Sequence, residues 1–232
     1  MLITIVITAH PDQYEVYESA MSCCVSHIAN GNQINQIFFM HEATYFASHE
    51  NSIKWQKFAQ QNNIELQTCR STAEDLHINI DDYNSGFMQS GLSALADSIM
   101  QTGATFQFGI ETKSIQNDET QLNCEMDKNP IIFVFQNQPK EHSSTKEGID
   151  LLLVLSSFDA ELLVVFKDDG VKNLFDDDNM PRYIKRFKAL SDFQVNDCYV
   201  VDSQMKEFSI PVKHMSNEQF ERLTQNAQKF FF

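Results

Sequence analysis

The sequence predicts an α/β protein with two tandem domains, each a mostly parallel sheet covered by helices on both faces. Two observations carry this prediction. Short apolar runs typical of buried strands alternate with longer segments whose apolar residues recur at helical spacing, an order typical of parallel sheets. The pattern of the first half then restarts near residue 130, and such self-similarity indicates a duplicated unit.

The first half begins with a β-rich run that His10 and Pro11 end, followed by a helix that Asn30 and Gly31 end. The same alternation continues to residue 108. The predicted strands are residues 2–8, 34–40, 64–68 and 104–108, and the predicted helices are 14–29, 53–61 and one that opens at 90–96.

The second half repeats the first at a nearly constant offset. Pro139 lies 128 residues after Pro11, and Cys198 lies 129 residues after Cys69. We therefore expect Cys198 to be the symmetry equivalent of Cys69. The remaining predicted elements are strands 131–135, 162–166, 207–212 and 229–232 and helices 146–157 and 216–228, with the terminal phenylalanines buried.

Between the two patterns lies a polar stretch without apolar periodicity. Residues 110–129 are rich in Ser, Thr, Asn, Gln and Asp, a composition typical of a linker. The sequence thus predicts a first domain at 1–109, a linker at 110–129 and a second domain at 130–232.

The charge of the chain is uneven. Residues 1–127 hold 4 Lys and Arg against 16 Asp and Glu, so this part carries −12 of the net −15. Such a surface repels phosphate backbones, which argues against direct, tight binding of nucleic acid.

The apolar start lacks a basic flank and a cleavage signal, and no apolar run is long enough to span a membrane. We expect a soluble cytoplasmic protein.

The five cysteines show no metal-binding spacing, and their odd number is a poor disulfide framework, so we expect reduced thiols. Residues 10–13 read His-Pro-Asp-Gln where a flavodoxin-type binder would carry a glycine- and hydroxyl-rich phosphate loop. A small-molecule binder is therefore disfavoured. We expect neither a metal nor an organic cofactor.

Cys69 is the candidate catalytic residue, because it follows the short strand 64–68 and the carboxyl ends of strands are where ligands bind in open α/β sheets. Ser71 and Thr72 are good helix N-caps, and a helix that begins there would favour a thiolate, as would Arg70. The alternative is an inert buried cysteine. His10, His41 and His77 are further candidates for supporting a thiolate, although lone histidines in loops are more often merely solvated.

Several motifs resemble the DsrE/DsrF-like sulfur-relay family. In the first half they are the turn FFMHEATY at 38–45, Cys69 after its strand, and GFMQSGLSALA at 86–96, which are similar to TusD-type members. In the second half EGIDLL at 147–152, VFKDDGV at 165–171 and YIKRFK at 183–188 are similar to TusC-type members. The chain resembles a natural fusion of the two types.

This resemblance implies a flavodoxin-like three-layer α/β/α fold for each half and a sulfurtransferase role. Cys69 matches the family cysteine that carries sulfane sulfur as a persulfide, accepted from a TusA-like donor and passed to a TusE-like acceptor for 2-thiouridine formation in tRNA. A TusB-like subunit and an oligomeric assembly are implied partners. Two departures stand out: Ala43 replaces a family glycine that Gly170 retains, which predicts a different backbone angle in the first turn, and Val201 replaces a cysteine common in TusC-type sequences.

A different class of function stays open. The two halves could form a non-catalytic, pseudo-symmetric scaffold or interaction subunit of a DsrEFH-like assembly, with Cys69 as a bystander. Alkylation at neutral pH discriminates between the two hypotheses, because a relay thiol should react well ahead of the other four.

Overall fold

The computed structural model of the 232-residue chain describes residues 1–109, 130–138, 144–175, 183–195, 197–202, 207–225 and 227–232. Contacts within the chain divide it into two compact units, Met1–Ile110 (unit one) and Glu111–Phe232 (unit two). The linker predicted at 110–129 lies outside the described residues. No helix in the described ranges is long and apolar enough to cross a membrane.

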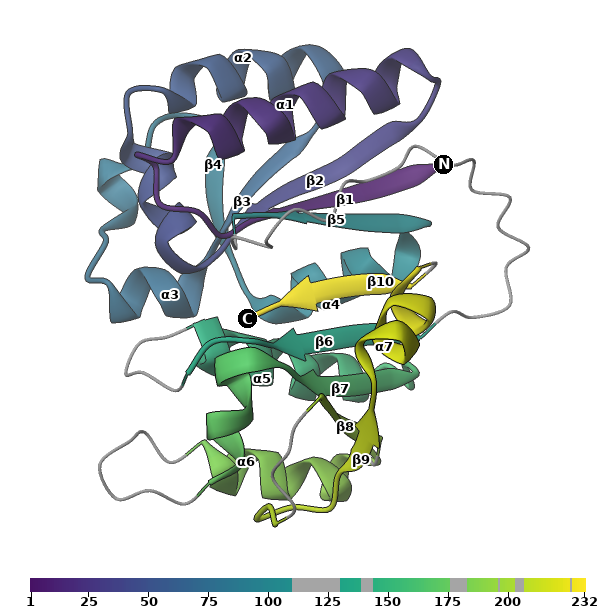
Figure 1. Ribbon diagram of the computed structural model, residues 1–232. Coiled ribbons are helices and arrows are strands. Elements are labelled where there is room, and N and C mark those ends of the chain that lie inside the picture. Colours follow the sequence, from purple (N-terminus) through teal and green to yellow (C-terminus); the bar gives the residue numbers. More distant parts are fainter. Residues whose placement is uncertain (110–129, 139–143, 176–182, 196, 203–206, 226) are drawn as a thin grey trace. The chain divides into compact units, whose positions relative to one another are not determined.

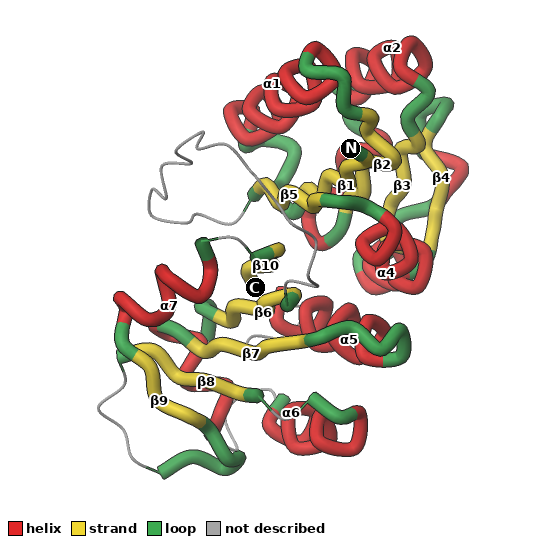
Figure 2. Tube along the Cα trace, turned by 90° about the vertical axis from the view of Figure 1, so that its right-hand side faces the viewer, coloured by secondary structure: helices red, strands yellow, loops and turns green. Residues whose placement is uncertain are grey.

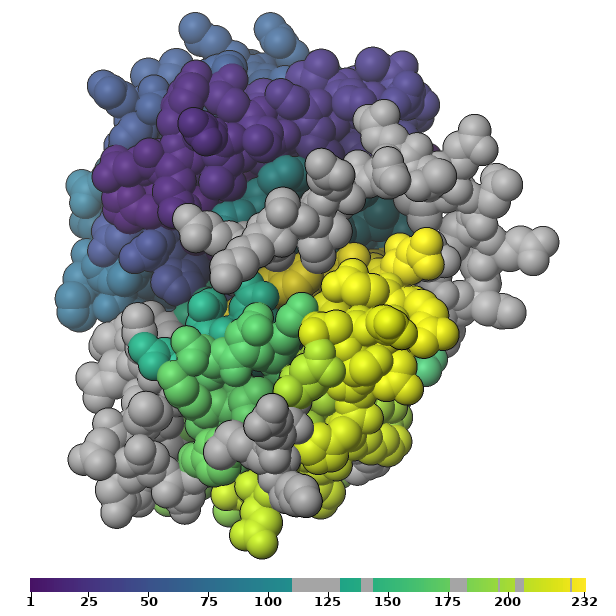
Figure 3. All heavy atoms as spheres, viewed as in Figure 1, coloured from purple at the N-terminus to yellow at the C-terminus, as the bar shows by residue number. Residues whose placement is uncertain are grey.

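Unit one is a five-stranded parallel sheet in the order β4-β3-β2-β1-β5. Helices α1 and α2 cover one face, and α4 covers the other (Figure 1). Figure 3 shows α1, in purple, as an outer layer of this unit. The elements are β1 (Leu2–Ile7), α1 (Tyr14–Ala29), β2 (Gln33–Phe39), η1 (His41–Ser48), α2 (Ser52–Asn62), β3 (Glu65–Cys69), α3 (Arg70–Asp75), η2 (Ile80–Asp82), β4 (Phe87–Ser90), α4 (Leu92–Gln101) and β5 (Ala104–Phe108).

The two faces of this sheet differ in chemistry. Ile3, Ile5 and Ile7 of β1 point to the α1 side and join its apolar core. On the α4 side, the Thr4 hydroxyl lies 2.6 Å from the Ser98 hydroxyl of α4, which also accepts a hydrogen bond of 2.8 Å from the Asn35 amide. Alternation along each strand therefore separates an apolar layer from a layer with hydrogen-bonded polar groups.

Unit two has the same topology, with parallel strands in the order β10-β6-β7-β8-β9. In both units the last strand pairs with the first, and strands two to four follow outward. Figure 2 shows α7 on one side of this sheet and α5 and α6 on the other. The elements are β6 (Ile131–Phe135), α5 (Ser144–Ser156), β7 (Leu162–Phe166), η3 (Asp168–Leu174), α6 (Ile184–Ala189), η4 (Leu190–Phe193), β8 (Cys198–Val201), β9 (Lys213–Met215), α7 (Asn217–Thr224) and β10 (Gln228–Phe231).

The tandem α/β fold class predicted from the sequence is confirmed, and several details of the prediction are wrong. Strands β4 and β8 are missing from the prediction, because each has only four residues and shows no clear alternation. The strand expected at 207–212 is absent from that range and lies instead at β9, since Pro211 cannot donate a hydrogen bond to a ladder. Helix α7 ends at Thr224 rather than near 228, although Ser216 caps it as expected, in a capping box with Gln219.

Both units turn sharply after their second strand. His41 has φ 55° and Asp168 has φ 53°, and each is the first residue of a 3₁₀ segment. Neither Ala43 nor Gly170 has a positive φ, so the prediction of a different backbone angle in the first turn is wrong. Gly170 is needed for space, because a Cβ atom there would lie 1.9 Å from the carbonyl oxygen of Phe135.

The terminal strand β10 closes the second sheet as predicted, although Phe231 is only partly buried. Phe230 and Phe232 are buried and stack on Phe133 with ring centroids 5.5 and 5.6 Å apart. Helix α5 approaches this cluster so closely that a Cβ at Gly148 would lie 2.5 Å from the Phe232 ring. Gly148 therefore permits the contact between helix and chain end.

We expect Gly148→Ala to destabilise the protein by about 1–3 kcal/mol, because a stacked, buried ring cannot give way to the new methyl group. Thermal unfolding of the full chain measures the change. In a Phe232→Ala background the same substitution should be neutral or stabilising by up to about 1 kcal/mol, since only the better helix propensity of alanine remains. Equal destabilisation in both backgrounds would contradict the packing argument.

Candidate functional site

Cys69 lies at the carboxyl end of β3, as the sequence predicts. The register between β2 and β3 pairs Phe39 with Thr68, and β4 places Ser90 beside Cys69. The segment η1 packs against both β3 and α3. Cys69 therefore stands where a strand, a short helix and a turn segment meet at one edge of the sheet.

The Cys69 side chain has no exposed surface. Its neighbours in sequence, Arg70 and Ser71, are both exposed. The Cys69 Sγ atom is 3.2 Å from the Ser71 Oγ, within hydrogen-bond distance for sulfur. The thiol is thus covered, but a polar group of an exposed residue lies directly against it.

The helix after Cys69 differs from the prediction. We expected Ser71 or Thr72 to cap it, but Cys69 itself is the N-cap residue and the helix begins at Arg70. Helix α3 spans only six residues, so the partial charge it contributes to the sulfur is small. The hydroxyl of Ser71 is the nearer source of stabilisation for a thiolate.

His41 is the first residue of η1, the segment that packs on the β3–α3 junction. Burial lowers its pKa, and the nearby Glu42 carboxylate opposes this only in part, so the imidazole is neutral at pH 7. Its Nδ1 accepts a hydrogen bond of 2.7 Å from the backbone N–H of Glu42. A neutral imidazole next to this junction is a candidate proton acceptor.

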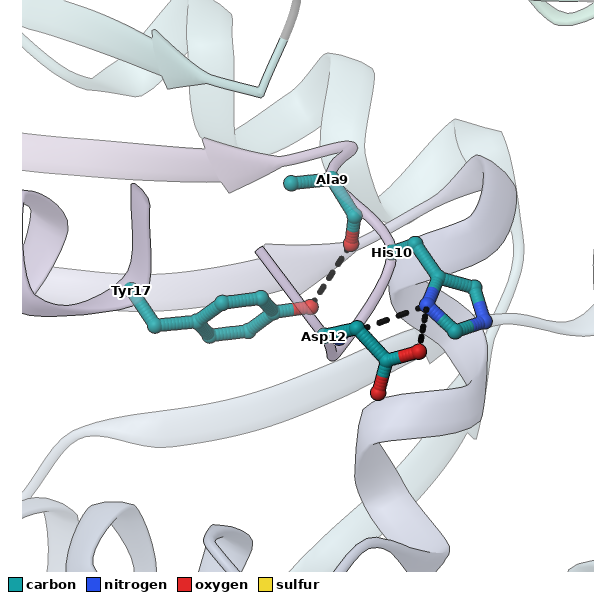
Figure 4. Close-up of polar contacts among 4 residues, drawn as sticks. All are labelled: Ala9, His10, Asp12 and Tyr17. Carbon is teal, nitrogen blue, oxygen red and sulfur yellow. Dashed lines mark hydrogen bonds and ion pairs between the residues drawn. The ribbon is translucent and has the colours of Figure 1, made fainter. Parts of the chain in front are cut away.

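The other two candidate histidines are placed differently. His10 follows β1, and β2 lies between β1 and β3 in the sheet. The His10 Nδ1 accepts a hydrogen bond of 3.3 Å from the Asp12 N–H and lies 3.4 Å from the Asp12 carboxylate (Figure 4). His77 follows α3 in a left-handed conformation with φ 56°. The sequence alone did not distinguish His41 from these two, because its burial depends on the packing of η1.

Cys198 is not the structural equivalent of Cys69, contrary to the prediction from the sequence offset. It is the first residue of β8, whereas Cys69 is the last residue of β3. Phe39 pairs with Thr68 in unit one, and its counterpart Phe166 pairs with Val200 in unit two. Val201 therefore occupies the position of Cys69, and unit two has no thiol there.

The remaining described cysteines are held in protonated form by burial. Burial raises the pKa of Cys24 to about 12 and that of Cys23 to about 11. The pKa of Cys198 is raised to about 11 by burial and by the Asp197 carboxylate beside it. Cys124 lies outside the described residues. Among the described residues, no three His, Cys, Asp or Glu side chains form a group that could hold a metal.

The fold and the site define a protein of two tandem α/β domains in which one domain presents a thiol at the carboxyl edge of its sheet. The DsrE/DsrF-like family model matches residues 129–231. TusC of Shigella flexneri serotype 5b is 35% identical over 82 residues, which cover 33% of this chain and 69% of that protein. A TusC homolog of Aliivibrio fischeri is 30% identical over 92 residues, 38% of this chain and 78% of that protein. This chain belongs to the DsrE/DsrF-like family.

We expect Cys24 and Cys198 to resist alkylation in the native protein at neutral pH. A thiol with a pKa of about 11 is only roughly 0.01% thiolate at pH 7, and burial also blocks the reagent. Iodoacetamide labelling followed by peptide mass spectrometry measures this, with denatured protein as the control in which every cysteine reacts. Rapid native labelling of Cys198 would contradict its placement in β8.

Proposed function

We propose that this chain is a sulfurtransferase of a sulfur relay that carries sulfane sulfur as a persulfide on Cys69. It accepts the sulfur from a TusA-like donor and passes it to a TusE-like acceptor, in an oligomer with a TusB-like subunit and other Tus proteins, for 2-thiouridine formation in tRNA. One observation carries the proposal: of the four described cysteines, Cys69 alone lies at the carboxyl edge of a sheet.

The chemistry needs two exchange steps and no cofactor. The Cys69 thiolate attacks the outer sulfur of the donor persulfide, the donor's sulfur–sulfur bond breaks, and the donor leaves as a thiolate. The acceptor's thiolate then attacks the outer sulfur now held on Cys69, whose own thiolate is the leaving group. Each step forms one sulfur–sulfur bond and breaks another, so no oxidant or reductant is consumed.

One residue in contact with the sulfur supports these steps. The Ser71 hydroxyl, 3.2 Å from the Cys69 Sγ atom, donates a hydrogen bond to the thiolate both when it attacks and when it leaves. His41, at the start of the segment that packs on β3 and α3, stays the candidate acceptor for the proton of the resting thiol. Ser71 therefore acts on the ionisation of Cys69 rather than on the transferred sulfur.

The burial of Cys69 gives the relay a required opening step. A partner's thiol reaches the sulfur only after the residues that cover it move, and the exposed positions of Arg70 and Ser71 make the start of α3 the part to be displaced. Between transfers, the closed state shields a persulfide from oxidants and from small thiols in solution. Docking of a partner protein is therefore coupled to the exposure of the Cys69 sulfur.

The second candidate function is the non-catalytic scaffold, and the complete burial of the Cys69 side chain is the observation that favours it. Val201 already gives unit two an apolar residue in place of the thiol, so one half of the chain has no transfer group in that position. On this alternative both units serve only to bind other subunits. Sulfur labelling of Cys69 separates the two functions.

We expect Cys69→Ser to keep the fold and to accept no sulfane sulfur. The assay incubates the full chain with a persulfidated carrier protein and follows radiolabelled sulfur and the intact mass, which rises by one sulfur atom on loading. Cys198→Ser is the matched control and should load as the wild type does, because Cys198 lies at the other end of its strand. Undiminished labelling of Cys69→Ser refutes the proposed function.

We expect Ser71→Ala to slow sulfur uptake about fivefold, the effect of losing roughly 1 kcal/mol of hydrogen bonding to a thiolate. Without that donor the pKa of the Cys69 thiol rises, so the midpoint of the pH–rate profile moves to higher pH. Ser71→Thr keeps a hydroxyl and should restore both values. A slower rate with an unchanged midpoint would show that Ser71 has only a structural role.

A further inference from the structure

A small pocket of about 160 Å³ opens in unit one at the start of α1, beside η1 and α2. Four aromatic residues, Tyr14, Tyr17, Phe46 and Trp55, line it together with two acidic residues, Glu18 and Glu50. Drug-sized ligands occupy pockets of about 300–1,000 Å³, so this volume suits a single side chain better than a nucleotide or another cofactor. The combination of aromatic and acidic groups then decides which side chain fits.

The aromatic part of the pocket is preformed. Tyr17 stacks on Phe46 with ring centroids 4.2 Å apart, and Trp55 meets both rings edge-on at 6.2 and 6.1 Å. The Tyr17 hydroxyl donates a hydrogen bond of 2.7 Å to the carbonyl oxygen of Ala9, which fixes the ring (Figure 4). All three rings are buried, so their positions are fixed before a ligand binds. Binding therefore does not have to immobilise these side chains.

The charges of the pocket favour a cation. Lys54 forms an ion pair of 2.7 Å with Glu18, so these two charges compensate each other. Glu50 is exposed and forms no ion pair within the described part of the chain, which leaves one carboxylate beside the rings. The exposed Tyr14 ring above the buried aromatic wall and the Glu50 carboxylate together attract a guanidinium or ammonium group. The excess of acidic residues in residues 1–127 adds a wider attractive field.

We propose that this pocket binds an arginine or lysine side chain of a protein partner. Pro11 of its lining follows β1, and η1 follows β2, so the pocket lies towards the same sheet edge at which Cys69 ends β3. A basic partner anchored there docks at the edge of the sheet that carries the thiol. That the partner takes part in sulfur transfer rests on the proposed function. That the pocket prefers a cation does not depend on the proposed function.

Trp55 is the single tryptophan of the chain, so its fluorescence and its indole N–H resonance report on this pocket alone. The full chain is titrated with N-acetyl-argininamide and with the neutral analogue N-acetyl-citrullinamide at matched ionic strength. We expect saturable changes at Trp55 with the arginine compound and binding about fivefold weaker, or none, with the citrulline compound. Equal responses to the two compounds, or no saturable response to either, overturn the proposal.

Two variants separate the contact of the cation with Glu50 from the general electrostatic attraction of the acidic surface. Glu50→Gln removes the free carboxylate of the pocket, and Glu15→Gln removes an exposed charge of α1 outside its lining. We expect the first to weaken argininamide binding about threefold or more, as loss of a single partly exposed charge contact does, and the second to leave it nearly unchanged. Equal weakening by both overturns the proposal.

These experiments test the proposed cation pocket and the proposed sulfur-relay function independently of each other. Cys69→Ser should bind argininamide as the wild type does, because Cys69 is not part of the pocket lining. If that variant still accepts sulfur, the proposed function fails and the pocket result stands. If it accepts none while Trp55 shows no preference for the cation, only the docking proposal fails.

Discussion

The hydrogen-bond register between the second and third strands is the constraint on which the candidate site depends. In unit one, Phe39 pairs with Thr68, so the next residue, Cys69, is the one that reaches the carboxyl edge. In unit two, Phe166 pairs with Val200, and Val201 reaches the edge instead. The same backbone pattern therefore presents a thiol in one copy and an isopropyl group in the other. Register, and not the mere presence of cysteine, decides where chemistry is available.

Helix α1 was predictable from the sequence because its 16 residues are enough to show a helical period, and its bounds are as predicted. Strand β7 also has the predicted bounds, because its five residues form a continuous apolar run, and the duplication correctly predicted a shared topology. Short elements such as β4 and α3 contain too few residues for periodicity to show. The position of Cys69 at a strand end was predictable, since an apolar run stops there.

The surroundings of the thiol were not predictable. The sequence offset of 129 pointed to Cys198 as its counterpart, but insertions between strands shift an offset without shifting the ladder, so the equivalence failed by three residues. The burial of Cys69 and the lowered pKa of His41 depend on how η1 packs against β3 and α3, a contact between segments far apart in sequence. No local pattern encodes such packing.

The left-handed residues at His41 and Asp168 bear on how the two copies diverged. Both adopt a conformation that L-residues rarely take, with an imidazole in one copy and a carboxylate in the other. The main-chain path was thus preserved while the side chains changed. Because valine and cysteine are similar in size, either residue fits at this position without a change in the surrounding packing. An architecture of this kind tolerates specialisation, with one half free to lose reactivity and keep its shape.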